Sequence, residues 1–213
     1  ILAGGKSTRI GVNKALMKIK GKSLLRHVVD KVGRVASEVV VVIGKGDARA
    51  EFSKILPRSI KVLNDTDTSE YESPIIGMIT GLEALKSEYT AVLPGDAPFI
   101  REEVLDYLFC KANRTDAAVP RWPNGWIEPL HAVYRVRSMV HAIRATLKAG
   151  ELRPFNAIKR LDKVIYVPIR EIRKIDRKLL TFTNINTPED LEIVRRIMSK
   201  AKTGFYSSSH REG

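Results

Sequence analysis

The sequence predicts a single α/β domain of three layers, in which a mostly parallel, twisted sheet carries helices on both faces. The main observation is that two kinds of apolar segment alternate along the chain. Short runs rich in valine and isoleucine are typical of strands buried on both faces, and longer stretches have apolar residues at helical spacing. The second observation is composition: 213 residues, 44% hydrophobic and 29% charged, are enough to build one large core.

The predicted strands begin at the N-terminus. Residues 1–3 have the composition of the end of a buried strand, and because the chain starts inside it without a methionine, we expect this strand to begin before Ile1. The other predicted strands are short apolar runs bounded by turn residues, and they cover 38–43, 61–63, 89–93, 117–119, 127–134, 164–167 and 180–183.

Helical spacing and capping residues predict the helices between these strands. Ser23 is placed to cap a helix that runs to Val35, and Thr187, followed by Pro188, is placed to cap the last helix. Further helices are predicted over 75–85, 102–112 and 137–149. Because no linker divides the chain, residues 1–200 form one predicted domain, and residues 201–213 a predicted disordered tail.

Composition excludes several classes of protein. The single cysteine, Cys110, cannot form an internal disulfide, which fits a reducing cytoplasm, and we expect it to be buried in its helix. No apolar run is long enough to span a membrane, no signal peptide is visible, and no zinc spacing is present. The net charge of +13 favours anionic partners, but the cations are scattered and no nucleic-acid-binding motif accompanies them, so we expect phosphorylated small molecules rather than nucleic acid.

The most informative motif is the loop after the first strand. Gly4 and Gly5 let backbone N–H groups approach a ligand closely, and Lys6, Arg9 and Lys14 follow them. Successive N–H groups and nearby cations form a site for a polyanion, so the sequence predicts a triphosphate-binding loop. The spacing is neither that of a P-loop nor that of a dinucleotide-binding motif. The alternative is an ordinary surface turn with solvated cations.

Carboxylates and amides follow other predicted strands, where the ligands of parallel α/β sheets bind. Asp96 follows the strand that ends at Leu93, and it is placed either to hold Mg²⁺ or to cap the next helix. Asn184 and Asn186 project to one side of an extended segment, with Ile185 pointing into the core. These amides are either neutral ligands for a hard cation or turn residues before a helix.

Asp65 lies in a third segment of this kind. It follows the strand over 61–63 and precedes the turn-prone Ser73-Pro74. Its carboxylate either accepts hydrogen bonds from a base or ribose or belongs to a solvated loop.

These motifs, in this order, resemble the molybdenum cofactor guanylyltransferases, which attach GMP to molybdopterin. The resemblance runs from Ile1 to Met198. It rests on the opening Gly-Gly loop and on short motifs that follow in the family's order, namely Pro74-Ile75-Ile76-Gly77-Met78, Gly95-Asp96-Ala97-Pro98-Phe99, Glu128-Pro129-Leu130 and Asn184-Ile185-Asn186-Thr187-Pro188-Glu189. It implies a Rossmann-like, glycosyltransferase-A-type nucleotidyltransferase fold and a Mg²⁺-dependent transfer of GMP from GTP to the terminal phosphate of the cofactor, with other cofactor-biosynthesis proteins as partners.

The resemblance also implies roles for particular residues. The nucleotide would contact the opening loop, Asp65 and Gly77, the loop contributing Leu2, Ala3, Gly4, Gly5 and Lys14. Asp96 and Asn186 would be metal ligands, and the catalytic groups would be Arg9, Lys14 and Asp96. Arg153 would lie on the pterin side of the site, with Glu128 and His131 in the acceptor region.

The chain departs from the family pattern at three places. Ser73-Pro74 stands where Gly-Pro is common, no asparagine follows the strand that ends at Ile43, and the basic segment 159–178 matches no family feature. The alternatives are a cytidylyltransferase acting on the same pterin, another small-molecule nucleotidyltransferase, and a GTP- or nucleic-acid-binding domain without catalysis. The sequence leaves open whether the pterin carries molybdenum or tungsten.

Overall fold

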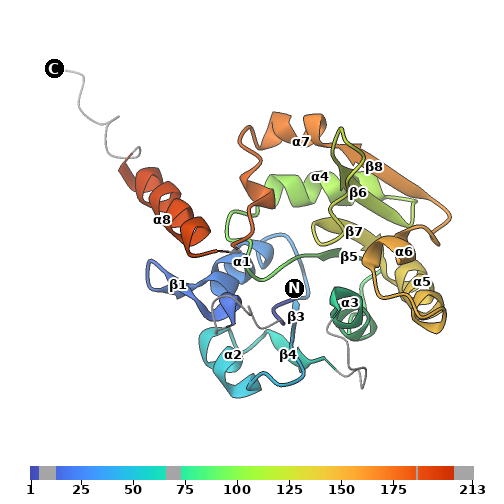
Figure 1. Ribbon diagram of the computed structural model, residues 1–213, viewed down its shortest axis with the longest axis horizontal. Helices are drawn as coiled ribbons and strands as arrows, with labels where there is room; N and C mark the ends of the chain where they lie inside the picture. Colours follow the sequence, from blue (N-terminus) through green and yellow to red (C-terminus); the bar gives the residue numbers. More distant parts are fainter. Residues whose placement is uncertain (5–12, 66–72, 186, 204–213) are drawn as a thin grey trace.

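One mixed sheet forms the centre of the computed structural model, which describes residues 1–4, 13–65, 73–185 and 187–203 (Figure 1). Strands β3 (Val40–Ile43) and β4 (Lys61–Asn64) pair in parallel. Four further strands pair in the order β5 (Tyr89–Val92), β7 (Ala132–Arg135), β6 (Ala117–Arg121) and β8 (Val164–Pro168), with β7 antiparallel to both of its neighbours. The sheet is therefore mostly parallel, as predicted.

The N-terminal segment joins these two groups of strands. Leu2 forms parallel bridges with Val42 on one side and with Pro94 on the other. The Leu2 N–H donates to the Leu93 carbonyl at 2.8 Å, and the Ala3 N–H donates to the Val42 carbonyl at 2.7 Å. The predicted first strand thus lies at the centre of the sheet, between β3 and β5.

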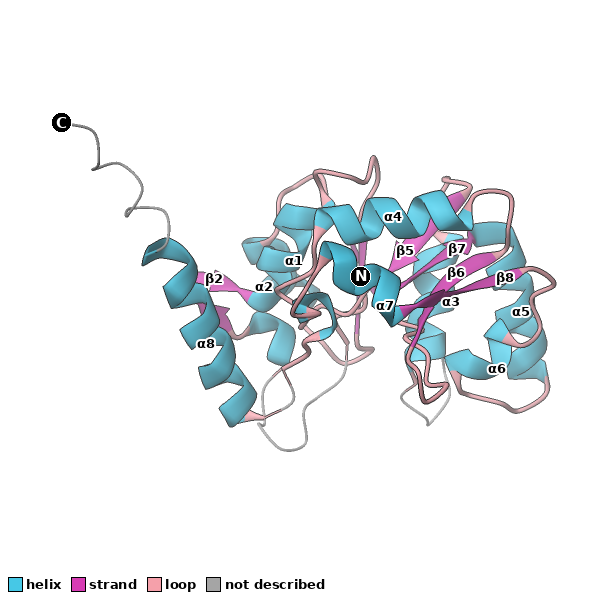
Figure 2. Ribbon diagram, turned by 90° about the horizontal axis from the view of Figure 1, so that it is seen from above, coloured by secondary structure: helices cyan, strands magenta, loops and turns pink. Residues whose placement is uncertain are grey.

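Helices cover both faces, which confirms the three-layer prediction (Figure 2). One face packs against α3 (Pro74–Glu83), α5 (Val136–Lys148) and α6 (Pro154–Ile158). The other packs against α1 (Leu24–Val32), α2 (Arg49–Ile55), α4 (Glu102–Ala112) and α7 (Ile169–Ile175). Alternate residues of β6 follow the same division: Ala117 and Val119 pack on the first face, and Ala118 packs on the second.

Smaller elements complete the described chain. They are the 3-10 helices η1 (Lys14–Leu16) and η2 (Leu180–Phe182), the short hairpin β1 (Lys18–Ile19) and β2 (Lys22–Ser23), and the last helix α8 (Pro188–Thr203). Leu191 and Val194 of α8 pack against Ile19 and Leu24, so α8 covers the hairpin and the start of α1. Of the predicted tail, residues 204–213 lie outside the described part of the chain.

Two predicted caps are present in the structure. The Ser23 Oγ accepts from the Arg26 N–H at 3.1 Å at the start of α1. At the start of α8, the Thr187 Oγ1 accepts from the Asp190 N–H at 3.1 Å, and the Asp190 carboxylate accepts from the Thr187 N–H at 2.9 Å. This reciprocal pair is a capping box.

Three predictions about the fold are wrong. The predicted strand over 127–134 begins only at Ala132, because residues 129–130 form a turn. Residues 180–183 are not a strand, because Leu179 takes a left-handed conformation (φ 52°) and the Asp176 carboxylate accepts from the Thr181 N–H at 2.8 Å, which holds the chain in the turn η2. Cys110 is in a helix but is exposed, because α4 buries Val104, Leu105, Leu108 and Ala112 on its opposite face.

Candidate active site

Several predicted site residues meet at one edge of the sheet, where the parallel strands end. The N-terminal strand ends at Gly4, β3 ends before Gly44, β4 ends before Asp65, and the β5 chain leads through Pro94 to Asp96. Because these strands are parallel, their carboxyl ends share one edge, which is where ligands bind in such sheets. The predicted residues Gly5 and Arg9 lie outside the described residues.

At this edge the N-terminal strand is pressed directly against the chain that follows β3. A Cβ atom on Gly4 would lie 2.6 Å from the Gly44 nitrogen and 3.0 Å from its Cα. Likewise, a Cβ atom on Gly95 would lie 3.0 Å from the Ala3 Cβ. Glycine is therefore required at both positions by close packing of backbone, whatever the loop binds.

Leu2 and Ala3 position this loop through the sheet. The Leu2 carbonyl accepts from the Gly95 N–H at 2.7 Å, and the Ala3 N–H already donates to Val42. The Ala3 N–H is consequently used inside the sheet, and the sequence-based expectation that it donates to a phosphate is corrected.

A network of amides and one carboxylate fixes the geometry of the edge. The Asn13 Nδ2 donates to the Ala3 carbonyl at 3.0 Å and to the Asp47 carboxylate at 2.9 Å. The same carboxylate accepts from the Gly44 N–H at 2.9 Å, and the Asn64 Nδ2 donates to the Asp47 carbonyl at 3.0 Å. The network joins the ends of three strands, and sequence analysis missed Asn13, Asp47 and Asn64.

Lys14 and Asp96 are electrostatically coupled across this edge. Asn13 caps the 3-10 helix that holds Lys14, because its Oδ1 accepts from the Ala15 N–H at 3.0 Å. Burial raises the pKa of the half-buried Asp96, and the positive charge of Lys14 opposes part of that rise. A half-buried carboxylate facing a cation is an arrangement that a divalent cation or a phosphate complex can complete.

Asp65 and Gly77, which the resemblance places at the nucleotide, lie close to each other. The Asp65 N–H donates to the Ile43 carbonyl at 2.8 Å, and its carboxylate accepts from the Thr80 hydroxyl at 3.2 Å. A Cβ atom on Gly77 would lie 3.7 Å from the other carboxylate oxygen of Asp65. Asp65 therefore lies against α3, and residues 66–72, which follow it, lie outside the described residues.

Ser73 links the start of α3 to the segment that carries Arg153. The Ser73 Oγ accepts from the Ile75 N–H at 3.4 Å and donates to the Leu152 carbonyl. Arg153 follows Leu152 and is exposed. Serine at this position therefore caps α3 and anchors the α5–α6 connection, which glycine could not do.

Glu128 and His131, which are predicted to lie in the acceptor region, belong to a partly buried polar cluster at the same edge of the sheet. Because β7 is antiparallel, its start lies beside the carboxyl end of β5, which places His131 there. The Trp122 Nε1 donates to the Glu128 Oε1 at 2.6 Å, and the Glu128 Oε2 lies 3.9 Å from the His131 Nδ1. The His131 ring packs edge-on against Phe182.

His131 is 2% exposed, and neither ring nitrogen has a hydrogen-bond partner within the described ranges. Burial lowers its pKa to about 4, and burial raises the pKa of Glu128, against the opposing hydrogen bond from Trp122. The imidazole is therefore neutral in the folded protein at pH 7.

Acidification is expected to destabilise the protein through His131. Its pKa is lower in the folded state than the ordinary 6.5, so stability is lost as the pH falls from about 6.5 towards 4, by at most about 3 kcal/mol. We expect urea unfolding midpoints of His131→Phe to fall less over this range than those of the wild type. His141→Phe, a change of an exposed histidine on α5, serves as the control. Equal pH slopes for all three proteins would contradict this role.

The predicted amides lie in the connection before α8. Ile185 is fully buried, as expected, and the Asn184 Oδ1 is buried with no hydrogen-bond partner in the part of the chain that the structure describes. Asn186 lies outside that part. An amide oxygen left in this state is available to a donor or a hard cation.

The donor set fits magnesium better than zinc. Over the described ranges, no three or more His, Cys, Asp or Glu side chains converge on a metal-binding position. Magnesium needs only one or two protein oxygens when substrate phosphates and water supply the others, so the Asp96 carboxylate is sufficient as a starting ligand.

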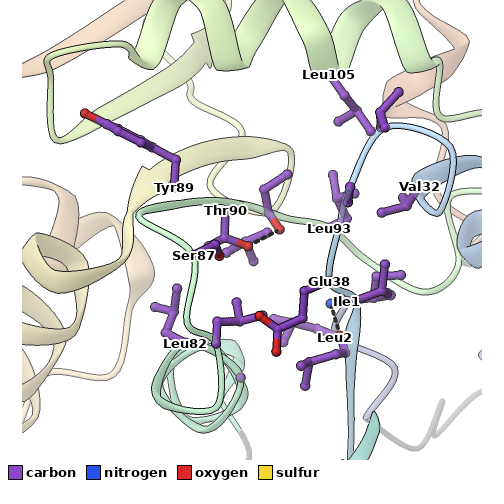
Figure 3. Close-up of a pocket in the computed structure, with 18 of the residues that line it drawn as sticks. Ile1, Leu2, Val32, Glu38, Leu82, Ser87, Tyr89, Thr90, Leu93 and Leu105 are labelled. Atoms are coloured by element: carbon purple, nitrogen blue, oxygen red, sulfur yellow. Dashed lines mark hydrogen bonds between the residues drawn. The ribbon is translucent and has the colours of Figure 1, made fainter. Parts of the chain in front are cut away.

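A separate cavity of about 300 Å³ lies beside Ile1, between β3 and β5 (Figure 3). Leu2 and Gly77 line it, but Asp65 and Asp96 do not. The walls are mainly apolar side chains such as Leu82, Leu93 and Leu105. Glu38 and Asp106 also line this cavity, and neither belongs to the candidate site.

Comparisons with known proteins agree with the geometry. Residues 1–164 match the family model described as the MobA-like NTP transferase domain. The chain is 37% identical over 196 residues to a probable molybdenum cofactor guanylyltransferase of Methanosarcina acetivorans, covering 90% of this chain and 87% of the relative. It is 36% identical to a protein of the same description from Natronomonas pharaonis, covering 93% and 96%.

The fold has a similar solved structure. The crystal structure of molybdopterin-guanine dinucleotide biosynthesis protein A from Archaeoglobus fulgidus superposes with a TM-score of 0.75 at 28% identity, covering 93% of this chain and 97% of the other.

No helix within the described residues combines the length and apolar character needed to cross a membrane.

Proposed function

Because the chain belongs to the MobA-like NTP transferase family, we propose that it transfers GMP from GTP to the terminal phosphate of the molybdopterin cofactor. The observation that carries this proposal is the meeting of Gly4, Lys14, Asp65 and Asp96 at the carboxyl edge of the sheet. The printed descriptions of the relatives and of the similar structure support guanine nucleotide and molybdopterin as the substrates.

In this proposal the nucleotide lies along the edge. The loop that begins at Gly4 and Gly5 surrounds the phosphates, with Arg9 and Lys14 supplying positive charge. Asp65, held against α3, accepts hydrogen bonds from the base or ribose. Arg153, Glu128 and His131 lie on the acceptor side.

The reaction follows from the charges. An oxygen of the terminal phosphate of the cofactor attacks the α-phosphorus of GTP, a new P–O–P bond forms, and the bond to the β-phosphate oxygen breaks to release pyrophosphate. The attacking oxygen is already anionic, so no general base is needed. The protein must align two anions and stabilise the charge that develops on the leaving group, which Lys14 and Arg9 are proposed to do.

Asp96 and Asn186 would hold the Mg²⁺ ion. When bound, the ion would neutralise charge on the reacting phosphates. Asp96 has the appropriate position because it follows β5 at the carboxyl edge of the sheet, where the positive charge of Lys14 acts on its carboxylate.

Nucleotide selectivity tests the proposal. The protein is incubated with Mg²⁺, metal-loaded molybdopterin and GTP, CTP, ATP or UTP in turn, and pyrophosphate release is followed. Release with GTP alone supports guanylyl transfer. A preference for CTP would replace it with cytidylyl transfer on the same acceptor, and no release with any nucleotide would contradict nucleotidyl transfer to this pterin.

Lys14→Ala is expected to weaken GTP binding by about 10- to 100-fold, because a hydrogen bond to a charged group contributes about 1.5–3 kcal/mol. Titration calorimetry with GTP and Mg²⁺ measures the change. Lys18→Ala, a change of an exposed lysine on β1, is the control and should bind like the wild type. An unchanged affinity in Lys14→Ala would remove Lys14 from the phosphate site.

A further inference from the structure

The basic segment 159–178 forms part of a groove that the proposed nucleotide site does not use. Two adjoining cavities of about 310 and 320 Å³ share Trp122, Pro123, Ile169 and Arg170. We call this surface the α7 groove. Its floor is apolar and aromatic, and its rim carries Arg121, Arg170, Arg173 and Lys174.

The rim cations on α7 lie on one face of the helix. Arg170, Arg173 and Lys174 are spaced i, i+3 and i+4, and all three are exposed. The other faces of α7 are fixed to α4 and the sheet: Ile169 and Ile172 are buried, Glu171 pairs with Lys111 at 3.4 Å, and the Ile175 carbonyl accepts from the Arg101 Nη1 at 2.9 Å. The basic face is therefore held towards the groove.

These cations are gathered on one face of a short helix. Some arginines on other helices are paired, as in Arg26 with Asp30 at 2.6 Å and Arg144 with Glu83 at 2.9 Å, while others, such as Arg137 on α5, have no ion pair within the described ranges. For Arg121, Arg170, Arg173 and Lys174, the described residues provide no ion pair. Like charges at i, i+3 and i+4 destabilise a helix, and Glu171 offsets part of this repulsion at Lys174, so a bound anion would relieve the repulsion that remains.

The aromatic floor is rigid. The Trp122 Nε1 is bonded to Glu128, and its ring meets Phe182 edge-on at 5.9 Å between centroids. Arg121 lies over the Tyr166 ring at 5.5 Å. Fixed aromatic rings and planar guanidinium groups favour a ligand with a flat ring system.

The groove lies at the same edge of the sheet as Asp96. Strands β6 and β8 are parallel to β5 and end at Arg121 and Pro168, and Figure 1 shows α7 beside them, away from β4. With β7 between β5 and β6, two strand spacings separate the ends of β5 and β6, about 10 Å. An acceptor whose phosphate is at Asp96 reaches Trp122 if its body extends this far along the edge.

We propose that the α7 groove binds the end of the acceptor that lies away from the reacting phosphate, a planar polar ring with anionic substituents. This inference rests on the proposed function. It assigns to the basic segment the selection of the acceptor, while the opening loop and Asp65 bind the nucleotide.

Arg170→Ala/Arg173→Ala tests the groove. Arg137→Ala/Lys148→Ala removes the same charge from exposed positions on α5, across the sheet, and is the control. We expect the groove variant to raise KM for metal-loaded molybdopterin by about tenfold or more, with KM for GTP and kcat within about twofold of the wild type. The midpoint temperature of thermal unfolding of the groove variant should not fall below that of the wild type. An unchanged acceptor KM, or an equal rise in both KM values, would overturn the proposal.

A direct binding measurement separates this proposal from the function on which it rests. The probe is neopterin monophosphate, followed by the fluorescence anisotropy of its own ring with GTP absent. We expect saturable binding by the wild type and the α5 control, and binding about tenfold weaker by the groove variant. If the protein binds the probe in this way but transfers no GMP, the proposed function is contradicted and the groove assignment stands. Absence of probe binding, or binding only of a poly-glutamate peptide, would overturn the groove assignment.

Discussion

Asp96→Ala is expected to lower kcat for GMP transfer by about 10²- to 10³-fold while leaving the protein folded, because one preorganised charged group at a reacting phosphate contributes about 3–4 kcal/mol to transition-state stabilisation. No stability should be lost at pH 7. Burial raises the pKa of Asp96 in the folded state, so any stability it contributes is present at low pH and is lost as the pH rises through that pKa. Ionising this carboxylate in the folded protein thus costs folding free energy, as expected of a functional group.

The control for this experiment is Asp106→Ala, a change of an exposed aspartate on α4. Initial rates are measured over a range of Mg²⁺ concentrations, together with urea unfolding of each protein. Asp96→Ala should remain inactive as Mg²⁺ is raised, and its unfolding midpoint at pH 7 should equal or exceed that of the wild type. Near-normal turnover in Asp96→Ala would rule out the metal assignment.

The edge of the sheet that carries the site could be predicted from sequence because the relevant residues directly follow strands. Gly4, Asp65 and Asp96 each come after a short apolar run, and parallel strands deliver such residues to one edge. The prediction needed only the positions of the strands and the rule that parallel strands place their carboxyl ends at one edge of the sheet. The capped helices α1 and α8 were predictable for a similar reason, since their signals lie within a few residues of one another.

The supporting network was not predictable from sequence because its members are far apart in the chain. Asn13 and Asp47 are separated by 34 residues, and their hydrogen bond exists only once β3 and the N-terminal strand are neighbours. An asparagine in a loop has the same local signal whether it joins such a network or faces water. Asn64 is the last residue of β4, but its side chain donates to the backbone carbonyls of Gly44 and Asp47, which no sequence pattern indicates.

Two of the wrong predictions concern which face of a helix is buried and whether a segment is a strand or a turn. The apolar run around Cys110 covers more than one face of α4. Packing against β6 and β7 buries Leu108, and packing against α1 and the chain after β5 buries Leu105. Residues 180–183 contain two threonines and a phenylalanine, which favour a strand, but the Asp176 carboxylate bonds the backbone and imposes a turn. Packing against other elements overrode the local preference in α4, and a side chain just outside the run did so at 180–183.

Gly4→Ala is expected to destabilise the protein by about 2–3 kcal/mol and to weaken GTP binding strongly. The new Cβ would lie 2.6 Å from the Gly44 nitrogen, and the atoms it meets are backbone, which cannot turn aside as a side chain can. The N-terminal strand must therefore shift, together with the Ala3–Val42 hydrogen bond. Displacing catalytic groups by 1 Å costs about 10²-fold in rate, so activity should fall with stability.

Gly46→Ala is the matched control, because a Cβ atom there would meet nothing within 4 Å. Because alanine has less conformational freedom than glycine in the unfolded chain, this change should leave the free energy of unfolding unchanged or raise it. Urea unfolding and GTP titration of both variants distinguish the two roles of Gly4. Loss of stability and binding together assigns the glycine to strand packing, whereas normal stability with lost GTP binding would mean that its place beside the ligand is what excludes a side chain.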